Sequence, residues 1–248
     1  MFENFGWLLV SAIIVGLAKG GIATAGALAV PFAALVMNPV AAAAILLPVF
    51  VTTDVFALWL YRRDFSRRNV SILIPAVLFG IVLASVLIPF LPEVILLAIT
   101  GGIGLWAVAR SVFKRNSTTP QLARVTPGLV WGTIAGITTF ITHSGAPPIQ
   151  AYMIPQNLTR LVFAGTMAIT MAVANFAKIP GYASLGLFDD IEWSLVGILV
   201  AAGIGATFFG RWMIKRMTDM FYIRVIQVLL FILSVLLLGK AVRLLLTS

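Results

Sequence analysis

Hydrophobic residues fall in long runs along this chain, and short polar segments separate the runs. Six runs reach the roughly 20 residues that a helix needs to cross the hydrocarbon core of a bilayer. They cover about residues 39–61, 69–89, 91–112, 159–186, 191–211 and 219–246. The pattern predicts six membrane-spanning helices.

Two further apolar regions, 6–37 and 126–156, are too long for one ordinary helix and are interrupted in the middle. The first contains Gly20-Gly21, and the second contains the segment SGAPP from Ser144 to Pro148. Glycine and proline are the strongest interrupters of regular structure. Each region is therefore predicted to form two half-helices.

The composition places these helices in a membrane. Hydrophobic residues make up 61% of the 248 residues, charged residues make up only 10%, and the mean hydropathy is +1.08. In soluble globular proteins about a quarter of the residues are charged. We therefore expect a polytopic membrane protein. Its first apolar segment is expected to stay in the mature chain, because no Lys or Arg precedes it as in a cleavable signal peptide.

The net charge of +9 has a topological explanation. The basic residues gather in short loops beside the apolar runs, which is the pattern that orients membrane proteins. Nucleic-acid binding is therefore not expected. The chain contains no cysteine, which excludes disulfides, thiolate catalysis and cysteine-based metal sites.

The two halves of the chain resemble each other. A shift of 124 residues superposes Lys19 on His143, Gly20 on Ser144, Gly21 on Gly145, Pro31 on Pro155 and Asp54 on Lys178. A shift of 125 superposes Gly80 on Gly205, in helices with small residues at a four-residue spacing that favours close packing. The polar stretch 111–124 separates the halves. We predict a first repeat at 1–115, a cytoplasmic linker at 116–125 and a second repeat at 126–248.

The charges of the loops predict how the repeats are oriented. If the broken regions crossed the membrane, the halves would be parallel, and the basic loop Arg62–Arg68 would share a compartment with the acidic loop Leu187–Glu192. If the broken regions are re-entrant, the basic loops are all cytoplasmic and the acidic loops are outside. The predicted fold is thus an all-α polytopic membrane protein with two inverted repeats, each with one re-entrant hairpin and three spanning helices.

Broken helices inside a membrane indicate a binding site. Irregular backbone at membrane depth is tolerated only where it is buried in protein or lines a cavity, and inverted repeats with broken helices are typical of secondary transporters. The second half-helices begin near Gly21 and Gly145, and helix N-termini attract anions. Lys19 and His143 add a charge and a protonatable group at matching positions. The sequence therefore predicts an anion site at the midplane.

The predicted residues form two groups. Substrate binding is assigned to Lys19, Gly20, Gly21, Thr24, Thr142, His143, Ser144 and Gly145. Coupling or gating is assigned to Asp54, Lys178 and His143, which is the natural proton carrier if transport is coupled to protons. Structural alternatives stay open: Lys19 snorkels to an interface, His143 is a satisfied structural residue, and Asp54 pairs with Lys178 as a structural ion pair.

The segments AKGGIATAGALAVP and THSGAPPIQAYMIP resemble the sulfite exporter TauE/SafE family of bacterial inner-membrane permeases. The resemblance covers nearly the whole chain, although the Gly runs of that family are reduced here to Lys19-Gly20-Gly21 and His143-Ser144-Gly145. It implies a multi-pass protein of the bacterial inner membrane that moves sulfur-containing anions such as sulfite, sulfoacetate or other organosulfonates.

Two other functions compete with a secondary transporter. An anion channel shares the same features. An intramembrane hydrolase could use Ser144 with His143 or Lys178, but adjacent residues on a turn cannot easily form a nucleophile and base pair. Gly21 to Gly26 lacks the GK[ST] of a phosphate loop, so ATP is not expected. We predict no enzyme, no cofactor and no metal, with lipid, the anion and protons as candidate partners.

Overall fold

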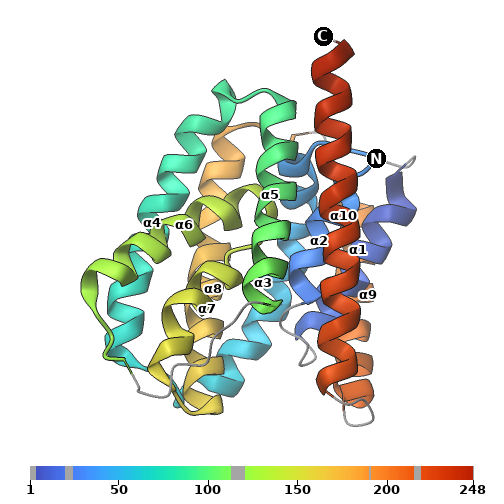
Figure 1. Cartoon of the computed structure of the whole chain (residues 1–248). Helices are drawn as coiled ribbons and strands as arrows, with labels where there is room; N and C mark the ends of the chain where they lie inside the picture. Colours follow the sequence, from blue (N-terminus) through green and yellow to red (C-terminus); the bar gives the residue numbers. More distant parts are fainter. Residues whose placement is uncertain (1–3, 20–24, 113–120, 190, 215–218, 248) are drawn as a thin grey trace.

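The computed structural model describes residues 4–19, 25–112, 121–189, 191–214 and 219–247, and within these ranges the regular structure is helical, with no strand (Figure 1). Ten α-helices are present in the described ranges. They are α1 (Phe5–Lys19), α2 (Gly26–Ala33), α3 (Pro39–Tyr61), α4 (Arg67–Leu87), α5 (Glu93–Val112), α6 (Val125–Thr142), α7 (Ala146–Met153), α8 (Arg160–Ser184), α9 (Trp193–Ile214) and α10 (Asp219–Thr247).

Several helices start where the sequence provides a cap. Asn38 precedes α3, and its side chain accepts hydrogen bonds from the amides of Val40 and Ala41, while Pro39 occupies the first turn. Ser66 caps α4 and Thr159 caps α8 in the same way. Side-chain oxygens satisfy N-terminal amides that have no partner within the helix. These caps fix the starts of three long apolar helices.

The all-helical, polytopic character predicted from the sequence is confirmed. Five helices within the described residues, α3, α4, α6, α8 and α9, are long and apolar enough to cross a membrane. Helix α5 has 20 residues and α10 has 29, close to the predicted runs 91–112 and 219–246. Helix α6 was predicted as a half-helix, yet its 18 residues have the length and composition of a span.

Both broken regions consist of two helices, as predicted. Region 6–37 contains α1 and α2, and region 126–156 contains α6 and α7. In the second region α6 ends at His143, whose backbone adopts the left-handed conformation at φ 55°. Pro147 and Pro148 then occupy the first turn of α7, where proline is compatible with a helix start. The break thus comes from a left-handed residue followed by a proline pair.

Each helix pair is a hairpin whose outer ends meet. The amide of Gln121, before α6, donates to the carbonyl of Pro155, after α7, at 2.9 Å. At the other hairpin the rings of Trp7 in α1 and Phe32 in α2 lie 4.8 Å apart between centroids. Since the chain returns to the end where it entered, both pairs have the geometry that the re-entrant prediction requires.

The two hairpins open toward opposite ends of the bundle. Gln156, after α7, accepts a hydrogen bond from Asn69 at the start of α4. Lys240 donates to the carbonyl of Ala34, after α2, and pairs with Glu93 at the start of α5. Because α4 runs from one of these ends to the other before α5 begins, the hairpins face opposite ways (Figure 1). The internal repeat, its boundaries and its orientation across a bilayer stay predictions.

Each hairpin packs against a helix of the other half. Helix α6 packs on α4, and α1 packs on α9. Glycines allow the close approach: a Cβ atom on Gly80 would lie 2.2 Å from the carbonyl oxygen of Thr133, and one on Gly16 would lie 2.1 Å from that of Gly203. The role predicted for Gly80 is confirmed, and the halves are interlocked through glycine contacts.

The corresponding role predicted for Gly205 is wrong. Gly205 is exposed, and a Cβ atom there would have no neighbour within 4 Å. The close contact in α9 is made by Gly203. Two residues correspond to about 200° around a helix axis, so Gly203 and Gly205 lie on opposite faces. The shift of 125 residues therefore aligned Gly80 with a residue on the outward face of α9.

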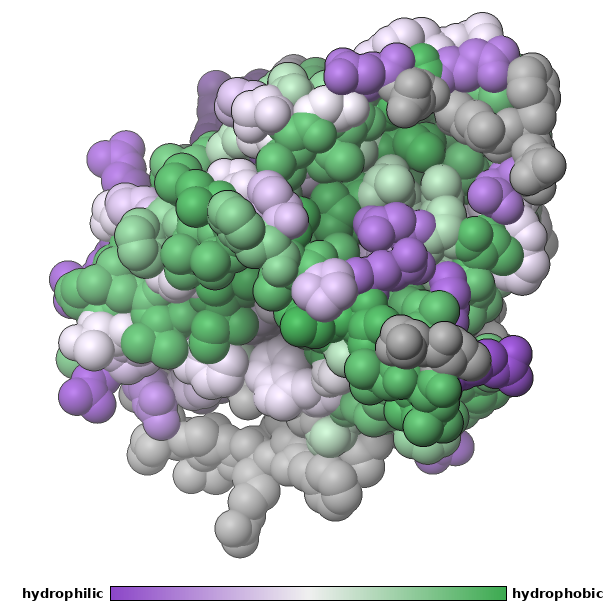
Figure 2. Space-filling view, turned by 90° about the horizontal axis from the view of Figure 1, so that it is seen from above, coloured by the Kyte–Doolittle hydropathy of each residue, from purple (hydrophilic) through white to green (hydrophobic). Residues whose placement is uncertain are grey.

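The outer surface is rich in apolar side chains. Figure 2 views the end of the molecule that lies uppermost in Figure 1 and shows hydrophobic residues over much of its area, with hydrophilic residues in separate groups. On α4, Phe79, Val82 and Val86 are each about 60% exposed. Such outward apolar side chains suit contact with lipid tails, whereas their exposure to water would be unfavourable.

Accessibility of introduced cysteines tests the orientation. Arg67 and Asp189 are exposed at opposite ends, and the natural chain has no cysteine to react in the background. We expect Asp189→Cys to react with a membrane-impermeant thiol reagent in intact cells, and Arg67→Cys to react only after permeabilisation. Reaction of both from one side would remove the inverted-repeat prediction.

Stability of glycine variants tests the interlocked packing. We expect Gly80→Ala to lower thermal stability, by about 1–3 kcal/mol as in overpacked cores, because the new methyl group meets backbone atoms of α6. Gly205→Ala is the matched control and should be neutral or slightly stabilising, since Ala favours helices. The measurement is the melting temperature of purified protein. Equal effects of the two variants would contradict this packing.

Candidate functional site

A cavity of about 260 Å³ lies between the two hairpins, α3 and α8. Its polar lining comes from Lys19, Tyr61, Thr139, His143, Ser144, Gln150 and Asn175. Its apolar lining comes from Ala18, Gly26, Ala27, Phe50, Ala146, Phe163, Ala164, Met167, Ala168 and Met171. The turn of the second hairpin and the end of α1 therefore meet in one cavity, as the sequence predicted for the two broken regions.

The cavity leads from the interior toward one end of the bundle. Along α8 its lining extends from Phe163 in the first turn to Asn175 near the middle, and on α3 it includes Tyr61, the last residue. The start of α8 lies at the end where α4 begins, because the amide of Ser66 donates to Thr166. This is the end carrying the basic loop Arg62–Arg68, predicted to be cytoplasmic.

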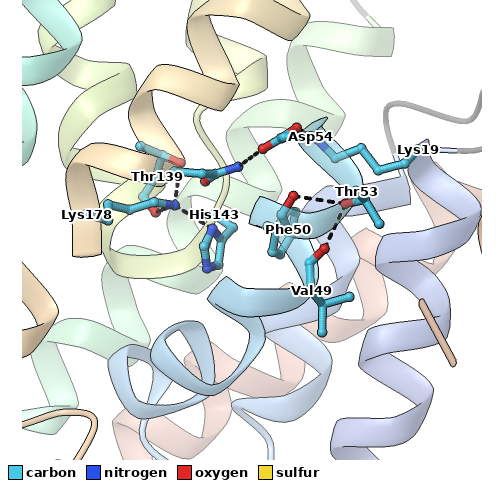
Figure 3. A network of polar contacts seen from close by, with 9 residues as sticks. Lys19, Val49, Phe50, Thr53, Asp54, Thr139, His143 and Lys178 are labelled. Atoms are coloured by element: carbon cyan, nitrogen blue, oxygen red, sulfur yellow. Dashed lines mark hydrogen bonds and ion pairs between the residues drawn. The ribbon is translucent and has the colours of Figure 1, made fainter. Parts of the chain in front are cut away.

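Lys19 and Asp54 form an ion pair beside the cavity (Figure 3). The Asp54 side chain is fully buried, whereas the Lys19 side chain is 19% exposed and lines the cavity. The second carboxylate oxygen of Asp54 accepts a hydrogen bond from Asn175 Nδ2 at 2.5 Å. The Lys19 ammonium also lies 5.8 Å from the centroid of the Phe50 ring, within cation–π range. Lys19 is thus held by contacts with α3 inside the bundle.

Lys178 is fully buried, and every hydrogen of its ammonium group has an acceptor. Its Nζ atom lies 3.1 Å from the carbonyl oxygen of Thr139, 3.3 Å from the hydroxyl of Thr139 and 2.5 Å from Nδ1 of His143. A lysine ammonium has three donors. The contacts with α6 and the hairpin turn therefore compensate for the loss of hydration.

The two neighbours of His143 fix its tautomer. Nε2 lies 2.8 Å from the carbonyl oxygen of Ala43, which can only accept, so Nε2 carries the proton. Nδ1 then accepts from Lys178, and the imidazole is neutral. The ring also stacks on Phe50 with centroids 4.1 Å apart. These contacts fit the alternative that His143 is a structural residue with satisfied hydrogen bonds, although its side chain also borders the cavity.

The ion pair expected between Asp54 and Lys178 is not formed. Each residue instead pairs within its own half: Asp54 with Lys19, and Lys178 with His143. The two contacts have the same separation of 35 residues, as the predicted repeat requires. Asn175 lies almost one helical turn before Lys178, and its side-chain amide donates to the carboxylate of Asp54 in place of Lys178. Asn175 thus links Asp54 in the first half directly to α8 in the second half.

The remaining predicted binding residues differ in position. Ser144 lines the cavity. Thr142 is buried, does not line it, and donates its hydroxyl to the carbonyl of Thr138. Gly145 also does not line it, and a Cβ atom there would lie 2.8 Å from Thr139, so this glycine allows close packing within the hairpin. The predictions for Gly20, Gly21 and Thr24 lie outside the described residues.

Three residues with direct roles in this network were absent from the predicted set. Thr139 precedes His143 by four residues, Phe50 precedes Asp54 by four, and Asn175 precedes Lys178 by three. Residues three or four positions apart lie on the same face of a helix. A search for polar and aromatic residues one turn before each charged residue would therefore have found them.

The described residues do not support hydrolysis at Ser144. Its hydroxyl donates to the carbonyl of Thr142 at 3.3 Å, and both ring nitrogens of His143 already contact other groups. The nucleophile and base contact that such an enzyme needs is not formed. Among the described residues no group of three or more His, Cys, Asp or Glu is placed to hold a metal ion.

A pair of double-mutant cycles tests the observed ion pair. We expect Lys19→Gln and Asp54→Asn to be coupled by about 1–3 kcal/mol in unfolding free energy, because each removes the partner of the other. Asp54→Asn with Lys178→Met should show a clearly smaller coupling. Unfolding in detergent and SDS mixtures measures both cycles. A larger coupling between Asp54 and Lys178 would contradict the pairing described here.

Comparison with known proteins gives one match. The chain matches the family described as Sulfite exporter TauE/SafE over residues 8–237. No curated protein and no solved structure matches it. The match includes both hairpins and all four residues of the two pairs, and it confirms the resemblance seen in the hairpin sequences. The chain therefore belongs to the sulfite exporter TauE/SafE family of membrane permeases.

Proposed function

We propose that this protein is a secondary transporter of a small sulfur-containing anion, such as sulfite or an organosulfonate, and that the anion binds in the cavity at Lys19. Family membership supports a permease for sulfite-type anions. The observation that carries the assignment to this cavity is the partly exposed ammonium group of Lys19, at the meeting point of the two hairpins.

The charges around the cavity favour an anion. Lys19 is the one lysine or arginine among the described lining residues, and Lys178 lies behind His143. Asp54 is the one carboxylate in the contacts of this network, it is balanced by Lys19, and His143 is neutral, so the network has no unpaired negative charge that would repel an anion. In a site shielded from water the ammonium group of Lys19 attracts an anion more strongly than it would at the surface.

The lining also favours a particular kind of anion. Gln150 and Ser144 are lining residues, and the side-chain amide of Gln150 can donate hydrogen bonds to sulfonate or sulfite oxygens, as can the hydroxyl of Ser144 when it turns away from the carbonyl of Thr142. Phe163, Met167 and Met171 give the cavity an apolar part, which suits an uncharged part of the ligand. A small sulfonate with a short uncharged carbon chain, such as isethionate, satisfies both parts of the lining.

The proposed cycle is that of a carrier in the bacterial inner membrane. The cavity opens toward the end with the basic loop, which corresponds to access from the cytoplasm if that end is cytoplasmic. The energy comes from an ion or substrate gradient. A channel would share the same charges, but its flux would not saturate at low substrate concentration or show exchange, so transport kinetics distinguish the two.

Binding and flux in a Lys19 variant test the proposal. Lys19→Gln keeps a hydrogen-bond donor but removes the charge. A charge-assisted hydrogen bond contributes roughly 1.5–3 kcal/mol, so the dissociation constant should rise roughly 10- to 150-fold. Thermal shift of the purified protein with sulfite, sulfate, thiosulfate, sulfoacetate, taurine and isethionate identifies the ligand, and saturable uptake into proteoliposomes measures transport.

Lys240→Gln is the matched control, because Lys240 also pairs with a carboxylate but lies away from the cavity. It should bind the anion as the natural protein does. Unchanged affinity of Lys19→Gln for every anion that binds would remove Lys19 from the site, and the absence of any anion binding would contradict the proposed function.

A further inference from the structure

We propose that the transported anion competes with Asp54 for Lys19, so that binding of each anion is accompanied by uptake of one proton by Asp54. This inference rests on the proposed function and adds the coupling ion and the residue that carries it. It assigns the ion pair beside the cavity to the resting state of the empty carrier.

The geometry brings the anion and the carboxylate to the same ammonium group. Lys19 contacts Asp54 on its buried side and is open to the cavity on the other. An anion that enters the cavity and contacts Nζ therefore lies within a few Å of the Asp54 carboxylate. Two negative charges that share one site in a shielded interior are strongly unfavourable, and one of them becomes neutral.

The carboxylate is the group that can become neutral. A sulfonate is the anion of a strong acid and stays ionised, whereas a carboxylate takes up a proton readily when its countercharge is removed. Among the residues that the structure describes, the one hydrogen-bond donor to Asp54 apart from Lys19 is Asn175. An amide donor lacks the full charge needed to replace the ammonium group, so the ionised form of Asp54 loses its main stabilisation.

The step is balanced in charge and atoms. In the empty carrier Lys19 is positive and Asp54 is negative. In the loaded carrier Lys19 is positive, the anion is negative, and a proton from the aqueous cavity has formed an O–H bond on Asp54. No electrons are transferred. For a monovalent anion the charge of this group is the same in both states, and the new O–H can donate to the bound anion.

Other titratable groups near Asp54 are occupied. Lys178 on α8 donates to Thr139 and to His143 and is fully buried. His143, at the turn after α6, donates from Nε2 to Ala43 and accepts at Nδ1 from Lys178. A proton on Nδ1 of His143 would break its contact with Lys178. Lys19 on α1 contacts Asp54 directly, so this pair is the one that an anion can open from the cavity.

Calorimetry of anion binding tests the inference. Isethionate and sulfoacetate are the probes, because both keep a constant charge between about pH 6.5 and 8, far above the carboxyl range near 4. The binding enthalpy is measured in buffers of different ionisation enthalpy, which gives the number of protons taken up. We expect about one proton per anion. The association constant should then fall about tenfold for each unit of rising pH.

Three variants locate the proton. In Asp54→Asn the anion should still bind, with no linked proton and no dependence on pH, since its competitor is gone. Asp54→Glu should restore proton uptake. Glu93→Gln is the matched control, because Glu93 also pairs with a lysine but lies outside the cavity, and it should behave as the natural protein does.

The outcomes separate this inference from the proposed function. Binding by the natural protein without proton uptake overturns the inference and leaves the proposed function intact, and this result does not depend on the folding of any variant. The same proton uptake in Asp54→Asn also overturns it. If neither anion binds, the proposed site for organosulfonates fails, and the inference fails with it.

Discussion

The cost of placing charge inside a membrane is the constraint that organises this molecule. A charged side chain at the centre of a bilayer is expensive and needs partners. Asp54 and Lys178 are both fully buried, and each has contacts that account for its charge. These contacts come from α1, α6 and α8, so the polar network determines how four helices meet. Hydrophobic side chains facing lipid cannot provide such specificity.

The broken helices supply the backbone that this network needs. His143 ends α6 in a left-handed conformation that is uncommon for residues other than glycine. That turn directs the imidazole between Ala43 on α3 and Lys178 on α8. If α6 continued without interruption, residue 143 would lie within a regular helix, and its side chain would not be directed by this turn toward Ala43 and Lys178. Strain of this kind is commonly retained at functional sites, where surrounding contacts maintain it.

The sequence predicts the helices and their interruptions well, because both depend on local patterns. Apolar runs, caps and the Gly and Pro interruptions act within one helix or one turn. The partners of charged residues depend on rotation of one helix relative to another, which no single run encodes. For this reason the contact of Asp54 with Asn175 was not predicted, and Gly205 was assigned to a packing face that Gly203 occupies.

The predicted internal repeat relates two parts of the network to each other. Lys19 with Asp54 and His143 with Lys178 are equivalent positions under the shift of 124, and both pairs are in contact. The first pair combines opposite charges at the edge of the cavity. The second combines a neutral ring with a buried cation, and all three ammonium donors are in use.

The two pairs thus have different properties. In the second pair Lys178 is fully buried and, among the described residues, its ammonium group contacts only Thr139 and His143, which leaves no position for a ligand. In the first pair Asp54 balances the charge of Lys19, and Lys19 also borders the cavity. Because Asn175 on α8 contacts Asp54 on α3, the change of protonation that we propose for Asp54 would act directly on the helix that carries Lys178. We propose that this contact links anion binding to helix movement.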